Sequence, residues 1–147
     1  MYLDSCIIVK LLVAEPDSEL FMRALEGKPI MTSELSQTEV FSALLSRERT
    51  GKISIPDRRR AWHEFEARVD AGEIKIEPLN SIVIRKANHL LEKCHPRVAL
   101  RSLDAIHLAT ADLCHDFPLT TTDGRLRDAA ILLGFKIFPL AENAPAN

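Results

Sequence analysis

The chain has 147 residues, a formal net charge of −2 at pH 7, 46% hydrophobic residues and 27% charged residues. These values predict one folded domain over residues 1–147 and exclude a disordered, fibrous or strongly basic protein. The apolar runs are much shorter than the roughly 20 residues of a membrane span, and no signal-peptide pattern precedes Asp4. We therefore expect a cytoplasmic protein without a membrane partner, whose last few residues form a flexible tail.

Short apolar segments alternate with longer segments of helical periodicity, which is the pattern of a parallel sheet covered by helices. In chain order, we predict strands over residues 1–3, 29–32, 74–77, 119–122 and 136–138. Helices are predicted over residues 5–14, 18–25, 36–49, 56–71, 82–95, 103–113 and 126–133. These elements indicate the α/β class and a three-layer α/β/α sandwich.

Local signals mark several helix ends. Ser36 and Glu39 have the spacing of a capping box, in which the two side chains accept hydrogen bonds from each other's backbone N–H groups. Gly51, Gly72 and Gly134 follow helical patterns at the point where a residue in the left-handed conformation ends a helix.

Acidic residues fall where the predicted strands give way to helices. Asp4 and Asp123 follow the first and fourth strands, and Glu39 and Asp104 lie in the first turns of the third and sixth helices. Taken singly, each has a structural explanation as a cap, a turn residue or a partner of a helix N-terminus. The carboxyl ends of parallel strands share one edge of a sheet, where α/β folds bind ligands. All four carboxylates are therefore candidates for a common site.

Carboxylates brought close together raise one another's pKa, so a cluster of them is stable mainly when a cation neutralises it. Oxygen ligands of this kind suit Mg²⁺ or Mn²⁺. Mg²⁺ binds one or two protein carboxylates together with substrate phosphates, as in sites that cleave phosphodiester bonds. The pattern points to such a site.

Four segments resemble, in order and spacing, the acidic motifs of the PIN-domain family. They are residues 2–5 (YLDS), 35–44 (LSQTEVFSAL), 101–111 (RSLDAIHLATA) and 120–126 (TTTDGRL). The resemblance spans nearly the whole chain, and the short length is similar to that of the VapC toxins of bacterial type II toxin–antitoxin systems.

The resemblance implies a PIN-like fold with a central, mainly parallel five-stranded sheet, and a divalent-metal-dependent endoribonuclease that uses Mg²⁺ or Mn²⁺ and leaves a 5′-phosphate and a 3′-hydroxyl. The residues that match the family's four acidic positions are Asp4, Glu39, Asp104 and Asp123. Our hypothesis is that Asp4, Asp104 and Asp123 hold the metal, while Glu39 ligates metal or orients the attacking water.

The polar positions beside the acidic ones are matched by Ser5 and by Thr121 or Thr122. One position departs from the family, because Cys6 stands where a second serine or threonine often follows Asp-Ser. The departure concerns a hydroxyl contact and leaves the metal site in place.

The resemblance also implies partners. A short antitoxin would lay a segment over the acidic cleft and insert an arginine that pairs with its carboxylates. A homodimer and a toxin–antitoxin hetero-oligomer are likewise implied, together with an RNA substrate.

Basic residues are concentrated away from the acidic motifs. Residues 47–60 hold six basic and two acidic side chains, among them the run Arg58, Arg59 and Arg60. This segment is interpreted either as a track for an RNA backbone or as a solvated helix face with local ion pairs. Arg101 and Arg125 lie close to acidic motifs in sequence and are candidates for contacts with phosphate.

Two further features have competing interpretations. His107 shares a helix face with Asp104, and we favour a packed or hydrogen-bonded side chain over a general acid. Trp62 and Phe65 are spaced for a contact between helices, which we favour over stacking on bases.

Three other functions compete with the ribonuclease. The first is a non-catalytic PIN-like binding or regulatory module, which the presence of all four acidic positions disfavours. A metal-dependent DNA nuclease is the second, because the metal chemistry does not distinguish the sugar. The third is a phosphotransferase with an aspartate nucleophile, which would need a second aspartate where Cys6 stands.

Overall fold

The computed structural model describes residues 1–139, so the predicted tail lies outside the described residues. The strands are β1 (Tyr2–Leu3), β2 (Ile30–Ser33), β3 (Ile74–Glu77), β4 (Leu119–Thr120) and β5 (Ile137–Phe138). The helices are α1 (Ser5–Leu12), α2 (Ser18–Leu25), α3 (Leu35–Arg49), α4 (Ile55–Asp70), α5 (Ser81–Cys94), α6 (Ser102–Cys114) and α7 (Gly124–Leu132). Every predicted strand and helix is present within a few residues of its expected bounds.

The five strands form one parallel sheet in the order β3-β2-β1-β4-β5. In the central strand, Tyr2 is in register with Met31 of β2 and with Leu119 of β4. The outer pairs, β2 with β3 and β4 with β5, are also parallel. All strands therefore end at the same edge of the sheet, as the α/β prediction required.

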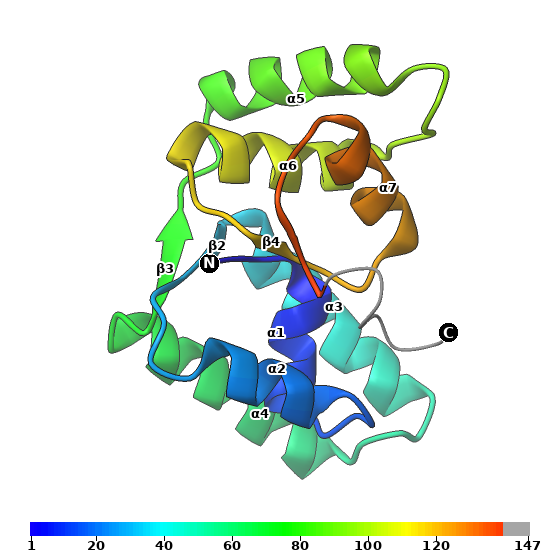
Figure 1. Cartoon of the computed structure of the whole chain (residues 1–147). Helices are drawn as coiled ribbons and strands as arrows, with labels where there is room; N and C mark the ends of the chain where they lie inside the picture. Colours follow the sequence, from blue (N-terminus) through cyan, green and yellow to red (C-terminus); the bar gives the residue numbers. More distant parts are fainter. Residues whose placement is uncertain (140–147) are drawn as a thin grey trace.

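Helices cover both faces of the sheet. Figure 1 shows α5, α6 and α7 on one side of the strands and α1 to α4 on the other. The consecutive β1 residues Tyr2 and Leu3 are both fully buried, yet they belong to the two separate hydrophobic clusters, since adjacent side chains of a strand point to opposite faces. The predicted three-layer sandwich is confirmed.

The two clusters hold the helical layers in place. Leu90 and Leu108 bury the inner faces of α5 and α6, and Leu44 and Phe65 do the same for α3 and α4. Burying a side chain of this size contributes roughly 1.5–3 kcal/mol. Trp62 packs against Phe41 of α3 with ring centroids 4.8 Å apart, which confirms the contact between helices.

The helix-end predictions have mixed outcomes. Gly51, Gly72 and Gly134 adopt φ values of +71°, +74° and +76°, the left-handed conformation predicted for them. The capping box at Ser36 and Glu39 is wrong, because α3 begins one residue earlier, at Leu35, and has no side-chain cap. Both side chains instead form hydrogen bonds with residues of other elements, which are described below.

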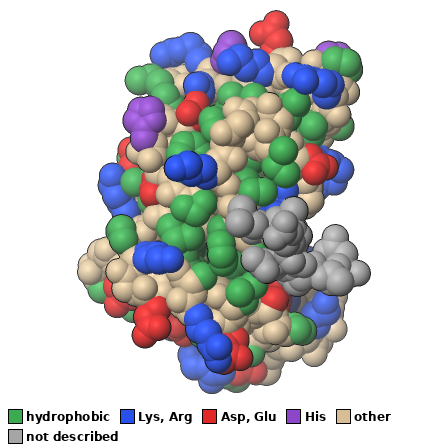
Figure 2. Space-filling view, viewed as in Figure 1, with side chains coloured by type: hydrophobic (Ala, Val, Ile, Leu, Met, Phe, Trp, Pro, Cys, Tyr) green, Lys and Arg blue, Asp and Glu red, His purple; other side chains and the backbone are tan. Residues whose placement is uncertain are grey.

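Figure 2 shows lysines and arginines interspersed with acidic residues on the viewed face, with hydrophobic side chains between them. Within residues 1–139, no helix combines the length and the hydropathy that crossing a membrane requires.

Candidate active site

The structure brings the four predicted carboxylates together in one cleft of about 280 Å³. Asp4 follows the end of β1, Glu39 projects from α3, Asp104 lies in the first turn of α6, and Asp123 is the N-cap of α7. These elements meet at the edge where the parallel strands end, and this topology joins residues that lie up to 119 positions apart. The other described residues that line the cleft are Ser5, Cys6, Val9, Ala43 and Arg47.

Asp4 is buried and held by its neighbours. Its Oδ2 accepts a hydrogen bond of 2.7 Å from the Thr121 hydroxyl and one of 3.0 Å from the Cys6 thiol. The Cys6 Sγ also lies 3.5 Å from Oγ1 of Thr122, so both predicted threonines border the site. The thiol therefore fills the place of the hydroxyl that the family pattern would supply, and it still donates to the carboxylate.

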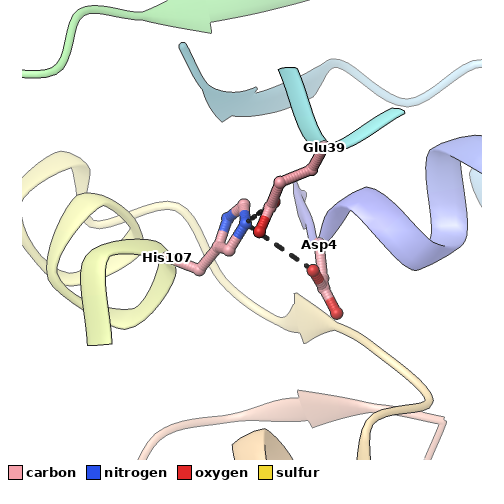
Figure 3. A group of neighbouring side chains, drawn as sticks. All are labelled: Asp4, Glu39 and His107. Atoms are coloured by element: carbon pink, nitrogen blue, oxygen red, sulfur yellow. Dashed lines mark hydrogen bonds and ion pairs between the residues drawn. The ribbon is translucent and has the colours of Figure 1, made fainter. Parts of the chain in front are cut away.

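Glu39 is fixed by two donors. The Ser5 hydroxyl donates to its Oε2, and Nε2 of His107 donates to the same oxygen over 2.7 Å. Figure 3 shows the His107 ring and the Asp4 and Glu39 carboxylates converging from three different elements. Burial alone would raise the pKa of Glu39, but the hydrogen bonds from His107 and Ser5 hold that pKa below its usual value. The carboxylate is therefore ionised at neutral pH.

His107 is buried, with 1% of its surface exposed. Its Nδ1 shares a hydrogen bond of 2.8 Å with the Tyr2 hydroxyl, and its Nε2 lies 3.7 Å from Oδ1 of Asp4. Burial opposes the charged imidazolium, yet the hydrogen bond to Glu39 and the nearby carboxylates raise the pKa of His107. The favoured prediction of a hydrogen-bonded histidine is confirmed, with both ring nitrogens engaged.

Asp104 has the opposite electrostatic environment. Its pKa is raised by burial and by the negative charges of Asp123 and Asp4. Its Oδ2 is buried and has no hydrogen-bond partner among the described residues. A buried carboxylate oxygen without a donor, beside two further carboxylates, fits a bound cation.

Asp123 is positioned through the backbone around β4 and α7. Its Oδ1 accepts a hydrogen bond of 2.9 Å from the N–H of Leu126, and its own N–H donates to the Thr121 hydroxyl over 3.0 Å. Arg127 is almost fully buried and donates to the backbone carbonyl oxygen of Thr121 over 3.2 Å. Thr121 thereby links Asp4 to Asp123.

The ligand chemistry of the cleft favours a hard cation. Ligand atoms of Asp4, Glu39 and His107 lie within 4.8 Å of one another. Because His107 is buried and already engages both ring nitrogens, the carboxylates are the better ligands. Carboxylate oxygens suit Mg²⁺ and Mn²⁺, and the orphan oxygen of Asp104 supports their fit.

The arginines that were predicted to contact RNA or phosphate lie outside the described lining of the acidic cleft. Arg101 is exposed and Arg125 is half-buried, and neither is among the described residues that line the cleft. Arg58 pairs with Glu48 over 2.8 Å. Of the rest of that run, Arg60 pairs with Asp57 and Arg59 is exposed. Binding of RNA by these arginines stays a prediction.

Sequence reasoning missed two supporting side chains. The Tyr2 hydroxyl holds His107 from the far side, and the buried Ser36 lies between Ser5, at 3.2 Å, and Thr32, at 2.5 Å. The strand position of Tyr2 signalled burial only, and the spacing of Ser36 to Glu39 signalled a cap. Neither local pattern contains the partner, which comes from another element.

Comparison with known proteins agrees with this geometry. The PIN domain family model matches residues 1–132. Ribonuclease VapC46 of Mycobacterium tuberculosis is 39% identical over 140 residues, covering 93% of this chain and 95% of that protein. Ribonuclease VapC35 of the same species is 33% identical over 144 residues, covering 93% and 94%.

Two solved structures share the fold. FitAcB from Neisseria gonorrhoeae aligns with a TM-score of 0.65 at 16% identity, over 93% of this chain and 95% of that one. A toxin–antitoxin complex from Klebsiella pneumoniae aligns with a TM-score of 0.54 at 20% identity, over 83% and 85%. With the family match and the identities to the ribonucleases, these findings establish that the chain belongs to the PIN-domain family.

Proposed function

We propose that this protein is a divalent-metal-dependent endoribonuclease and the toxin component of a type II toxin–antitoxin system. The observation that carries the proposal is the meeting of four carboxylates, from four separate segments, in one cleft. Relatives that are named ribonucleases and are 32–39% identical over nearly the whole chain support RNA as the substrate.

Asp4, Asp104 and Asp123 are the proposed ligands of Mg²⁺ or Mn²⁺. When bound, the ion lowers the pKa of water and stabilises negative charge on the phosphate undergoing attack. The threonine bridge between Asp4 and Asp123 fixes the two ligands relative to each other. Loss of any of the three ligands should therefore abolish cleavage.

Glu39 is proposed to orient the attacking water. Its lowered pKa keeps it ionised, and the two donors to Oε2 restrict the direction of the other oxygen, Oε1. Ser5 and His107 act as positioning residues for this carboxylate. Attack by water, with the P–O3′ bond broken and the 3′-oxygen leaving, would give a 5′-phosphate and a 3′-hydroxyl.

The proposed partner is an antitoxin whose arginine pairs with the cleft carboxylates and so excludes the metal. The fold shared with the toxin–antitoxin complex from Klebsiella pneumoniae supports a partner of this class. A homodimer and a hetero-oligomer with the antitoxin are proposed with it, and residues 1–147 are proposed to form a single PIN-like domain.

The test is incubation of total cellular RNA with the purified full-length protein, freed of any partner, with Mg²⁺, with Mn²⁺ and with chelator. Discrete fragments that need metal and disappear in Asp4→Asn would support the proposal. Parallel incubation with single-stranded DNA separates the RNA and DNA activities. Cleavage of DNA alone would establish a DNA nuclease, and no cleavage of either polymer by folded protein would favour a binding module.

A further inference from the structure

Arg47 is a cation inside the acidic cleft that the function proposed above leaves unused. It follows Ala43 by four residues and Glu39 by eight on the same face of α3, and all three line the cleft. Within residues 1–139, Arg47 is the single cation in that lining. An α-helix rises 1.5 Å per residue, so Arg47 lies about 12 Å along the axis from Glu39.

The guanidinium is anchored outside the group of catalytic carboxylates. Nη2 of Arg47 donates to Glu15, in the segment that joins α1 to α2. Glu15 also accepts from Lys10 over 2.8 Å, and Lys10 donates to Asp17 over the same distance. Burial opposes ionisation of Glu15, but the hydrogen bonds from Lys10 and Arg47 hold its pKa below the usual value.

This arrangement leaves Arg47 free to bind a second anion. A guanidinium carries five N–H donors, and no described residue accepts from the donors of Arg47 other than Nη2. Its side chain is 25% exposed and lines the cleft. Lys10 would still neutralise Glu15 if Arg47 turned to another partner.

The negative charge of the cleft gives a cation at its border a role in binding RNA. Four carboxylates repel the phosphates of an RNA, and within residues 1–139 Arg47 is the one cation that lines the cleft with them. Arginine binds phosphate oxygens through two parallel hydrogen bonds. The backbone of Arg47 lies about 12 Å along α3 from that of Glu39, which suits a phosphate next to the one under attack.

We propose that Arg47 binds a phosphodiester that flanks the scissile one, and that Glu15 holds the guanidinium in position until the RNA displaces it. This inference rests on the nuclease function proposed above and adds a substrate-binding residue to that site. It assigns the contact to Arg47 rather than to Arg101 or Arg125.

The test measures RNA binding separately from cleavage. Asp104→Asn protein is added to a short fluorescein-labelled single-stranded RNA of mixed sequence, with Mg²⁺ present, and binding is measured from the fluorescence anisotropy. The titration is repeated over a series of salt concentrations. Adding Arg47→Ala should weaken binding about tenfold. Because one phosphate contact is lost, the slope of log K against log[salt] should become shallower by about 0.7.

Arg68→Ala is the matched control. The Arg68 side chain is 27% exposed and pairs with a glutamate, Glu73, over 3.2 Å, but it lines a different hollow. It should change neither the affinity nor the salt slope. Arg47→Lys should bind between the parent and Arg47→Ala, and Glu15→Gln should bind more tightly, because the competing carboxylate is gone.

The outcomes separate this inference from the proposed function. If the wild-type protein cleaves RNA with metal while folded Arg47→Ala binds the probe with the parent's affinity and salt slope, the inference on Arg47 is wrong and the nuclease stands. If the wild-type protein cleaves nothing, the nuclease is wrong. A parent that binds no RNA overturns the inference on Arg47, and cleavage by the wild-type protein alone then decides the nuclease function.

Discussion

Nε2 of His107 lies 2.7 Å from Oε2 of Glu39 and donates a hydrogen bond to it, although 68 positions separate the two residues in sequence. The Tyr2 hydroxyl engages the opposite ring nitrogen over 2.8 Å. A strand, a helix of one layer and a helix of the other are thus joined through one imidazole. His107 is buried, and Glu39 lines the cleft. The hydrogen bond between them therefore links a side chain of the protein interior to a carboxylate of the site.

The first prediction concerns the positioning of Glu39. His107→Gln should lower kcat about tenfold to a hundredfold with little change in KM, because a hydrogen bond between charged groups contributes roughly 1.5–3 kcal/mol. Tyr2→Phe keeps the ring and should cost about threefold. Steady-state cleavage of a labelled RNA measures both, with circular dichroism as the check of folding. A folded His107→Gln enzyme with the wild-type kcat and pH–rate profile would show that the contact is only structural.

The second prediction concerns how the free energy of unfolding of the metal-free protein, measured in chelator, depends on pH. The pKa of His107 is raised, so its contribution is fully present below the unfolded value of about 6.5 and is lost as the pH rises through the folded pKa. The pKa of Glu39 is lowered, so its contribution is present above about 4.5 and is lost as the pH falls through the folded pKa.

The difference in free energy of unfolding between the wild type and His107→Gln should therefore be largest between about pH 5 and pH 6.5 and should shrink on either side. Urea unfolding in chelator across the pH range measures this difference. A difference that is constant over that range would contradict the coupling of the two groups.

The third prediction concerns the repulsion at Asp104. Its pKa is raised by burial, Asp123 and Asp4, so the charged form destabilises the fold once the pH exceeds the usual carboxyl value. Asp104→Asn should raise Tm at pH 7 in chelator and should lower cleavage by at least about a hundredfold. Thermal melts with and without Mn²⁺ check this, because the ion should stabilise the wild type more than the variant. A lower Tm for Asp104→Asn in chelator would contradict it.

The fourth prediction concerns Cys6. Burial and the neighbouring charge of Asp4 raise the pKa of its thiol from 9.0 to about 12, which lowers the thiolate fraction on the order of a thousandfold. Iodoacetamide at pH 8 should therefore leave Cys6 unmodified in the folded protein and label it in urea. Peptide mapping by mass spectrometry gives both results. Rapid labelling of Cys6 in the folded protein would show that the thiol is not held against Asp4.

Most of the fold could be predicted from the sequence because its signals are local. The alternation of short apolar strands with helical periodicity identified every strand and helix, and Gly51, Gly72 and Gly134 ended helices as predicted. The four acidic positions followed from their place at the ends of the predicted strands and near the starts of helices, although Glu39 lies in the second turn of α3 and not in the first, because that helix begins at Leu35. That they share a cleft is a consequence of parallel topology, in which all strand ends meet at one edge.

The tertiary structure decided which partners those side chains have. The local pattern assigned Glu39 to a helix cap, but donors from α1 and α6 take its carboxylate, since a buried charge is stabilised more by charge-assisted hydrogen bonds than an exposed cap would stabilise the helix. Nearness in sequence favoured Arg101 and Arg125 as basic neighbours of the site. The helical face shared with Glu39 brings Arg47 into the cleft instead, because contacts across the fold depend on packing, which no single segment encodes.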